Sequence, residues 1–352
     1  MTGFRIAEAD LAACRRLLAG GSKSFHAASM LLPRRIAAPA AALYAFCRVA
    51  DDEIDLGADK QAAMERLVAR LDAACAGRPQ DDPVDRALAA VVHHFGIPRT
   101  LPEALLEGLA WDADGRRYED MAALESYAAR VAGTVGAMMT LLMGVREPAA
   151  IARACDLGLG MQLTNIARDI GEDAREGRLF LPLSWLREEG IAPEDFLAAP
   201  RFSPAIGRLT ARLLAAADRH YARAEAGIAL LPRDCRAGIG AARVIYAEIG
   251  REVERNGLDS VTRRAVVPGW RKAVLLARAA GALVAQRDGA GAPPCEATTY
   301  LVDAVAAAPR PRGLIPRGWG ARLVWALELM DQIDRDGAPR SLPFNRSTVS
   351  AD

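Results

Sequence analysis

The chain has 352 residues, about half of them hydrophobic, and a formal net charge of +1. It is long enough for a large apolar core, but its balanced charge excludes nucleic acid as an expected partner. The six cysteines are scattered without a C-x-x-C pair, and the four histidines show no metal-ligand spacing. This pattern excludes a zinc ribbon and is typical of reduced thiols in the cytoplasm.

The N-terminal segment shows no signal for export. Glu8 and Asp10 fall where a signal peptide needs an uninterrupted apolar core. The longest nearly uncharged apolar run, residues 131–145, is shorter than the roughly 20 residues that a membrane-spanning helix needs. We therefore expect a cytoplasmic protein in which this run forms a buried helix.

Helical periodicity recurs from the N-terminus to about residue 287, with Gly and Pro between the periodic segments. No stretch alternates in the manner of a strand. The pattern predicts an all-α domain over residues 1–287. Residues 288–352 read as a Pro/Gly-containing C-terminal tail with a short helix at 323–333 and no catalytic signal.

The first candidate site follows Gly20 and Gly21. Ser22 and Ser24 stand at a helix entry, where backbone N–H groups and hydroxyls often bind phosphate. An ordinary N-cap explains the same residues equally well. The local sequence leaves both interpretations open.

A first aspartate pair lies at the end of the helix predicted over residues 44–55. Asp51 and Asp55 are four residues apart and so share one helix face, and Arg48 lies one turn before them on the same stripe. A single D-x-x-x-D is most simply a solvated face with ion pairs. Its interpretation depends on whether a second copy exists.

Two features lie between the aspartate pairs. Asp112 belongs to a charged cluster at residues 111–118. This cluster either reaches a cation bound between the aspartate pairs or forms ion pairs on the surface. The apolar run 131–145, with Tyr127 at its mouth, carries a stripe of small residues at helical spacing. The stripe indicates either close helix packing or a wall for a long apolar chain; its members are Gly133, Gly136, Ala137, Thr140 and Gly144.

The second pair, Asp169 and Asp173, repeats the first, and the polar stripe continues upstream through Asn165 and Gln162. Burying such a stripe is costly unless it has partners. Mg²⁺ prefers carboxylate and phosphate oxygens, and arginine, here Arg178, donates to phosphate in a fork. Two such helices face to face therefore predict a clamp for a Mg²⁺–diphosphate group, although Arg178 also suits a helix end.

Taken together, these segments resemble the squalene/phytoene synthase family, and most closely its proteobacterial members from carotenoid pathways. The resemblance runs from about residue 12 to 276. It rests on residues 22–29 (SKSFHAAS), 43–55 (LYAFCRVADDEID), 105–112 (LLEGLAWD), 131–136 (VAGTVG) and 162–182 (QLTNIARDIGEDAREGRLFLP).

The resemblance implies an all-α class I isoprenoid synthase fold, with helices around a central cavity. It implies that the metal ligands are Asp51, Asp55, Asn165, Asp169 and Asp173. It also implies that Tyr127 lies near the reacting carbons and that diphosphate is bound by Ser24, Arg48, Gln162, Arg178 and Tyr246. The resemblance also makes one arginine of the pair Arg263 and Arg264 a further candidate for a diphosphate ligand, and the sequence leaves open which one.

The chain departs from the family pattern at a few positions. Phe180 stands where relatives often have tyrosine, Ala128-Ala129 replaces a frequent Cys-Tyr, and Gly21 replaces a histidine of some members. None of these changes touches the aspartates. They bear on the choice of substrate rather than on the presence of activity.

The implied activity is Mg²⁺-dependent head-to-head condensation of two geranylgeranyl diphosphates, through a cyclopropyl diphosphate, to phytoene. Mn²⁺ is an alternative cation, and no NADPH is expected. Peripheral membrane contact and transfer of product to a desaturase fit the lipid substrate and product. Alternatives are a squalene, dehydrosqualene or presqualene-diphosphate synthase using farnesyl diphosphate, and a non-catalytic assembly factor. A terpene cyclase or chain-elongating enzyme fits the second aspartate motif poorly.

Overall fold

A computed structural model describes residues 4–20, 32–56, 59–272, 274–275 and 291–311. Every regular element in these ranges is helical, which confirms the all-α prediction. The elements are α1 (Glu8–Gly20), α3 (Arg34–Leu56), α4 (Lys60–Cys75), α5 (Pro83–Phe95), α6 (Thr100–Ala113), α7 (Met121–Ala128), the π-helix η1 (Ala129–Gly133), α8 (Thr134–Leu142), α9 (Pro148–Arg175), α10 (Leu183–Glu188), α11 (Pro193–Ala198), α12 (Pro204–Ile228), α13 (Arg233–Arg255), the 3₁₀ turn η2 (Glu296–Thr298) and α15 (Thr299–Ala307).

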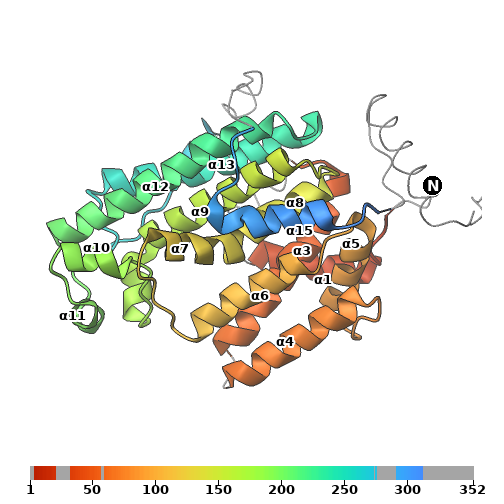
Figure 1. Ribbon diagram of the computed structural model, residues 1–352, viewed down its shortest axis with the longest axis horizontal. Coiled ribbons are helices and arrows are strands. Elements are labelled where there is room, and N and C mark those ends of the chain that lie inside the picture. Colours follow the sequence, from red (N-terminus) through yellow and green to blue (C-terminus); the bar gives the residue numbers. More distant parts are fainter. Residues whose placement is uncertain (1–3, 21–31, 57–58, 273, 276–290, 312–352) are drawn as a thin grey trace, which may run out of the picture. The chain divides into compact units, whose positions relative to one another are not determined.

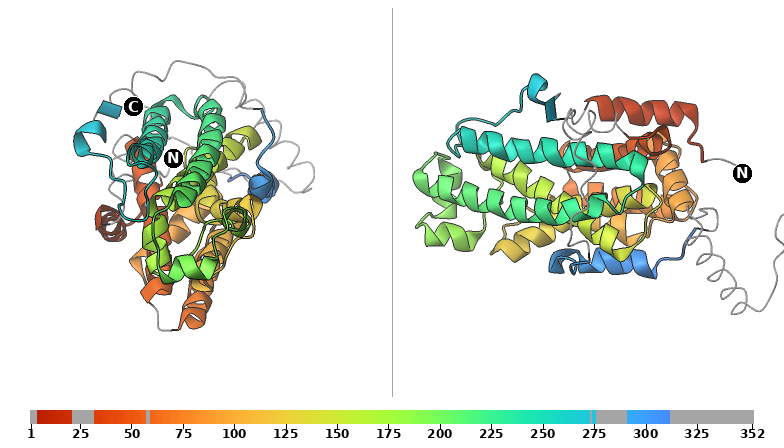
Figure 2. Two further views of the ribbon diagram at one scale, coloured as in Figure 1. Left: turned by 90° about the vertical axis from the view of Figure 1, so that its left-hand side faces the viewer. Right: turned by 90° about the horizontal axis from the view of Figure 1, so that it is seen from above.

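Helix α9 is the element around which the others pack. Pro148 occupies its first turn, where the missing N–H is no loss, and the helix runs 28 residues before Gly177 turns the chain at φ +77°. Its neighbours include α8, η1, α12 and α13, and Figures 1 and 2 show α12 and α13 running beside it. More than half of its residues are buried, including Ala, Gly and Leu on successive turns.

Glycine lets α9 approach both η1 and α8 to backbone contact. A Cβ on Gly136 would lie 2.2 Å from the Ala154 carbonyl oxygen, and one on Gly158 would lie 2.3 Å from that of Ala132. The close-packing interpretation of the small-residue stripe is therefore correct. Gly136 and Thr140 also line an apolar cavity, and the alternative interpretation, a wall for a long apolar chain, stays a prediction.

The segment after the undescribed residues 276–290 packs on the same compact unit, which extends to Pro311. Helix α15 lies against α6, α8 and α9, and it is the blue helix in Figure 1. Arg146 donates to the carbonyls of Phe95 and Gly96 and to those of Val305 and Ala308. One guanidinium thus joins the ends of α5 and α15. The predicted domain boundary at 287/288 and the helix at 323–333 lie outside the described residues and stay predictions.

Among the described helices, none has the length and apolar character to cross a bilayer. The apolar run expected as one buried helix is divided between η1, which is partly buried, and α8, which is largely buried. Its hydrophobicity therefore serves the interior of the protein.

The contact at Gly158 gives a stability test. Gly158→Ala should lower the free energy of unfolding by about 1–3 kcal/mol, because the new methyl group meets a backbone carbonyl that cannot rotate away. Chemical denaturation measures the change. Gly269→Ala is the control, since nothing lies within 4 Å of its Cβ position, and its change should stay within about 0.5 kcal/mol. Equal midpoints for the two variants would contradict the packing argument.

Candidate active site

Two adjoining cavities lie among the helices. The first, called here the polar cavity, has a volume of about 410 Å³ and is lined largely by charged and polar side chains. The second, the apolar cavity, has a volume of about 300 Å³. Gln162 and Asn165 line both. A charged compartment and an apolar one therefore meet at these two amides.

Residues from separate parts of the chain converge on the polar cavity. Helix α3 contributes one aspartate, Asp51, and α9 contributes two, Asp169 and Asp173. The other lining residues are Arg48, Ile54, Leu109, Asp112, Tyr127, Gln162, Asn165, Ile166, Arg178, Phe180 and Arg264. The structure thus brings together most of the residues that the sequence singled out, while their individual roles stay predictions.

Three of the predicted site residues are not placed in this cavity. Ser24 lies outside the described residues. Asp55 is in the last turn of α3, but its side chain is outside what the structure describes. Tyr246, on α13, lines the apolar cavity rather than the polar one. Its predicted role as a diphosphate ligand stays a prediction.

The two aspartates of α9 differ in their surroundings. Burial would raise the pKa of Asp169, but hydrogen bonds from Arg168 and Arg264 outweigh it and hold the pKa below its ordinary value. Burial raises the pKa of Asp173 to about 6, with Arg178 opposing the shift at 3.1 Å. Of the two aspartates of α9, Asp173 is therefore the one that a further positive charge would stabilise more.

Each arginine that lines the polar cavity forms an ion pair with an aspartate. Arg48 contacts Asp51 at 3.3 Å and also pairs with Asp52. Arg178 contacts Asp173, and Arg264 donates to Asp169 at 2.8 Å. The lining thus holds three arginines and four aspartates, and each of these arginines is paired with an aspartate. A metal–diphosphate group, which carries both signs, can pair with both sets.

Asp112 is a site residue that the sequence did not resolve. The hydroxyl of Tyr127 donates to its Oδ2 at 2.6 Å, and burial raises the pKa of Asp112 to about 7 against that hydrogen bond. The surface alternative for Asp112 is wrong, because it lines the polar cavity. Local periodicity does not distinguish it from Asp114, and the available signal was the segment 105–112 of the family resemblance, which ends at Asp112.

Aromatic rings border the same cavity. The rings of Tyr127 and Phe180 stack at 5.3 Å between centroids, and Tyr118 lies 5.2 Å from Tyr127. The position where relatives often have tyrosine thus holds a purely apolar ring against Tyr127. Such faces attract positive charge without offering a nucleophile.

Gly171 explains why Arg264 reaches Asp169. The Gly171 N–H donates to the Ser260 carbonyl at 3.0 Å, and a Cβ there would lie 2.3 Å from the Val261 carbonyl oxygen. The loop after α13 therefore lies directly on α9 between its two aspartates. This contact brings Arg264 into the cavity, whereas Arg263 is not among the lining residues. Of the two arginines that the sequence left open, Arg264 is the one that lines the cavity, and its role as a diphosphate ligand stays a prediction.

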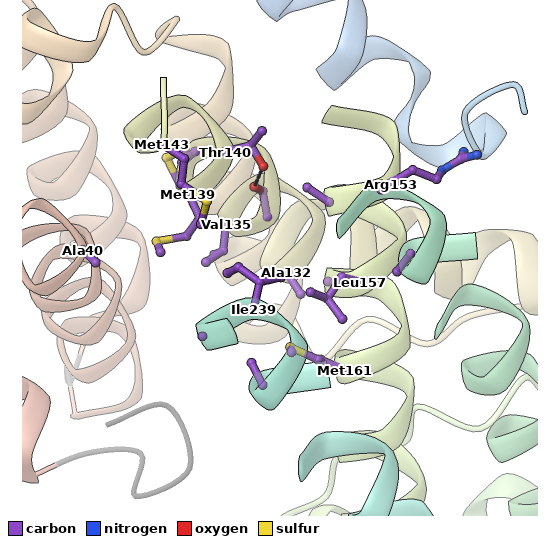
Figure 3. A pocket seen from close by; sticks show the side chains of 18 of the residues that line it. Ala40, Ala132, Val135, Met139, Thr140, Met143, Arg153, Leu157, Met161 and Ile239 are labelled. Carbon is purple, nitrogen blue, oxygen red and sulfur yellow. Dashed lines mark hydrogen bonds between the residues drawn. The ribbon is translucent and has the colours of Figure 1, made fainter. Parts of the chain in front are cut away.

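The apolar cavity is lined by side chains of α3, η1, α8, α9, α12 and α13. In Figure 3, Val135 and Met139 lie on one side, and Leu157, Met161 and Ile239 on the other. Methionine side chains are unbranched and adapt to irregular apolar surfaces. Arg153 also lines the space, but its guanidinium donates to the carbonyls of Ala292 and Pro293. The cavity suits a flexible hydrocarbon.

Comparisons with known proteins agree with this geometry. A family model described as squalene/phytoene synthase matches residues 18–271. The chain is 59% identical over 278 residues to the phytoene synthase of Rhodobacter capsulatus, covering 78% of this chain and 82% of that protein. It is 52% identical over 345 residues to the phytoene synthase of Cereibacter sphaeroides, covering 94% and 96%.

A solved structure shows the same fold. The crystal structure of a dehydrosqualene synthase in complex with a ligand superposes with a TM-score of 0.72 at 33% identity, covering 78% of this chain and 97% of that one. The predicted class of fold, all-α with the helix arrangement of isoprenoid synthases, is thereby confirmed.

Adjacent arginines provide a matched test of the site. Arg264→Gln should lower kcat by on the order of 100-fold, because it removes a positive charge held beside Asp169 where negative charge must be stabilised. Arg263→Gln should leave kcat near that of the unaltered chain. Steady-state kinetics with a prenyl diphosphate substrate measure both. Equal losses of kcat in the two variants would show that the contact with Asp169 does not identify the arginine that acts in the site.

Proposed function

Because the chain belongs to the squalene/phytoene synthase family of prenyltransferases, we propose that it condenses two geranylgeranyl diphosphates head to head to phytoene, the first committed step of carotenoid biosynthesis. The relatives at 59% and 52% identity, both phytoene synthases, support this product. One observation carries the proposal. The polar cavity, with aspartates from three helices, joins the apolar cavity at Gln162 and Asn165, and a prenyl diphosphate has the same two-part chemistry.

Mg²⁺ is the proposed cation. The donor set of the polar cavity fits it, because the carboxylates and Asn165 offer only hard oxygen ligands. The raised pKa of Asp173 indicates a buried carboxylate that lacks sufficient positive charge. The proposed ligands are Asp51, Asp55, Asn165, Asp169 and Asp173. When bound, Mg²⁺ would neutralise charge on the leaving diphosphate; Mn²⁺ offers the same chemistry.

The protein's own residues would do three things. Arg48, Arg178 and Arg264 bind the diphosphate oxygens and stabilise them as the carbon–oxygen bond breaks. The rings of Tyr127 and Phe180 lie beside the resulting allylic cation. The apolar cavity holds the prenyl chains and excludes water, which would otherwise trap that cation as an alcohol.

The proposed sequence has two ionisations. Loss of the first diphosphate gives an allylic cation, and the double bond of the second substrate attacks it. Loss of one proton closes a cyclopropyl diphosphate. Loss of the second diphosphate, rearrangement and loss of another proton give the C40 hydrocarbon. Two substrates thus give phytoene, two diphosphates and two protons, so the chemistry needs no reductant and we expect no NADPH.

The main alternative is the shorter substrate, farnesyl diphosphate. The dehydrosqualene synthase structure shares the fold, so the fold does not decide between the substrates. The two phytoene synthases at 59% and 52% identity favour the longer one. A non-catalytic assembly role is disfavoured because the aspartates and arginines remain together in one cavity.

We also propose peripheral contact with a membrane in the cytoplasm, from which a desaturase would take up the product. Val266 and Trp270 are each 68% exposed, and Val274 follows one turn later at 48%. Large apolar side chains in water at this spacing suit insertion among lipid headgroups. Lys272 lies in the same segment and suits an anionic surface.

Product analysis tests the proposed substrate. The purified chain should convert geranylgeranyl diphosphate with Mg²⁺ and without NADPH to a C40 hydrocarbon, identified by chromatography and mass spectrometry. Farnesyl diphosphate in a parallel reaction should give little product, because its shorter chain fills less of the apolar cavity. A C30 product formed faster than the C40 one would move the protein to the squalene branch.

Removal of a cavity carboxylate tests the catalytic site. Asp51→Asn and Asp169→Asn should each lower turnover by about 100-fold or more, because each removes one charge that holds the cation. Asp218→Asn is the control, since this carboxylate pairs with Arg251 on the surface outside both cavities. Turnover near the original rate in either cavity variant, with unchanged circular dichroism, would rule out the proposed metal site.

A further inference from the structure

A second cluster of metal-binding side chains lies apart from the residues that line the two cavities. Glu125 on α7, His220 on α12 and Cys295, immediately before η2, each direct one ligand atom to a common point. These atoms all lie within 4.8 Å of one another. His220 is 6% exposed, and the other two residues are partly buried. The cluster therefore joins three segments that are far apart in the sequence.

The distances are close to those of a tetrahedral metal site. His220 Nε2 lies 3.0 Å from Glu125 Oε1, and Cys295 Sγ donates to Glu125 Oε2 at 3.7 Å. Ligands around Zn²⁺ stand roughly 3.3–3.8 Å apart, given bond lengths of about 2.0–2.3 Å. These two contacts use different oxygens of Glu125, whereas the single ligand atoms of the three residues lie within 4.8 Å of one another. An approach of up to roughly 1–1.5 Å would bring them to the spacing of a tetrahedral site. A water molecule would complete the four ligands.

The second nitrogen of His220 is already oriented. His220 Nδ1 lies 3.2 Å from Asp156 Oδ1, and this carboxylate is completely buried. Arg153 and Arg223 hold it at 2.8 Å and 3.0 Å. A carboxylate behind a histidine fixes its tautomer and leaves Nε2 directed at the metal, as at most histidine–zinc sites.

The donor types select the class of metal. Nitrogen, thiolate sulfur and one carboxylate oxygen suit Zn²⁺ and related first-row ions, whereas Mg²⁺ requires oxygen ligands. We propose that Glu125, His220 and Cys295 bind a Zn²⁺-type ion, at a site separate from the aspartate cavity. This inference does not depend on the proposed reaction.

The two arginines that bind Asp156 behind this cluster also bind the segment that follows residue 290. Besides binding Asp156, Arg153 donates to the carbonyls of Ala292 and Pro293, and Arg223 donates to that of Pro293. Figure 3 shows the Arg153 side chain extending away from the labelled apolar residues of the cavity. A metal at Cys295 would therefore attach residues 291–307, including α15, to α7 and α12. Its role is structural.

Cobalt substitution tests the site directly. The full chain, stripped with a chelator, is titrated with Co²⁺ under argon, with excess Mg²⁺ to fill the carboxylate site. One Co²⁺ per chain should bind with a near-ultraviolet thiolate-to-cobalt band and the visible bands of tetrahedral cobalt. Zn²⁺ should displace it. Added Zn²⁺ should also raise the midpoint of thermal unfolding.

Two variants and a control identify the ligands. Cys295→Ser should abolish the thiolate band while leaving the contacts among Glu125, His220 and Asp156 in place. Cys75→Ser should retain it, because Cys75 is a partly buried thiol outside the cluster. Glu125→Gln should weaken Co²⁺ binding by on the order of 10-fold or more, since changes even beyond the direct ligands cost about 10- to 100-fold.

The outcomes separate a metal site from a purely protein cluster. If His220 instead remains a protonated bridge between two carboxylates, the unaltered chain binds no Co²⁺ with a thiolate band, and the proposal is overturned. Retention of the band in Cys295→Ser overturns it as well. Should that variant not fold, unchanged Co²⁺ affinity in Glu125→Gln has the same consequence.

Discussion

The structure depends on the electrostatic cost of placing aspartates on a buried helix. Helix α9 has to be apolar enough to pack against α8, α12 and α13, yet it carries Asp169 and Asp173 into the interior. Burial penalises both charges. The arginines of α9, of the turn after it and of the loop after α13 reduce that penalty, and this requirement explains why those segments lie where they do. The remaining imbalance at Asp173 favours binding of a cation.

Close backbone contact makes this arrangement possible. At Gly136 and Gly158 the absence of a side chain lets α9 touch α8 and η1, and both glycines line the apolar cavity. At Gly171 the same absence admits the loop that delivers Arg264. Glycine thus serves the core and the site in the same way, through steric room rather than through an unusual backbone angle.

The sequence predicted what depends on local periodicity. Spacing of four residues placed Asp169 and Asp173 on one face, and the repeat at Asp51 predicted that two helices would face one cavity. Local periodicity could not select Asp112 over Asp114 or Arg264 over Arg263. Those choices depend on which of two nearby side chains lines the polar cavity in the folded protein. The Glu125, His220 and Cys295 cluster was equally hidden, since its members lie 95 and 170 residues apart in the chain and ligand spacing is informative only within a local motif.

The arginines that receive residues 291–311 have a consequence for the order of folding. Arg146 and Arg153 are synthesised well before the C-terminal carbonyl groups that they bind. Those acceptors follow 139 to 162 residues later in the chain. Until that segment arrives, two guanidinium groups in an apolar surrounding lack those acceptors, so the final packing of α9 has to wait. Closing so long a loop carries an entropic cost before any contact rewards it. The last folding step during synthesis is therefore expected to be the docking of the final described helix, and chains cut short before it should be captured by chaperones.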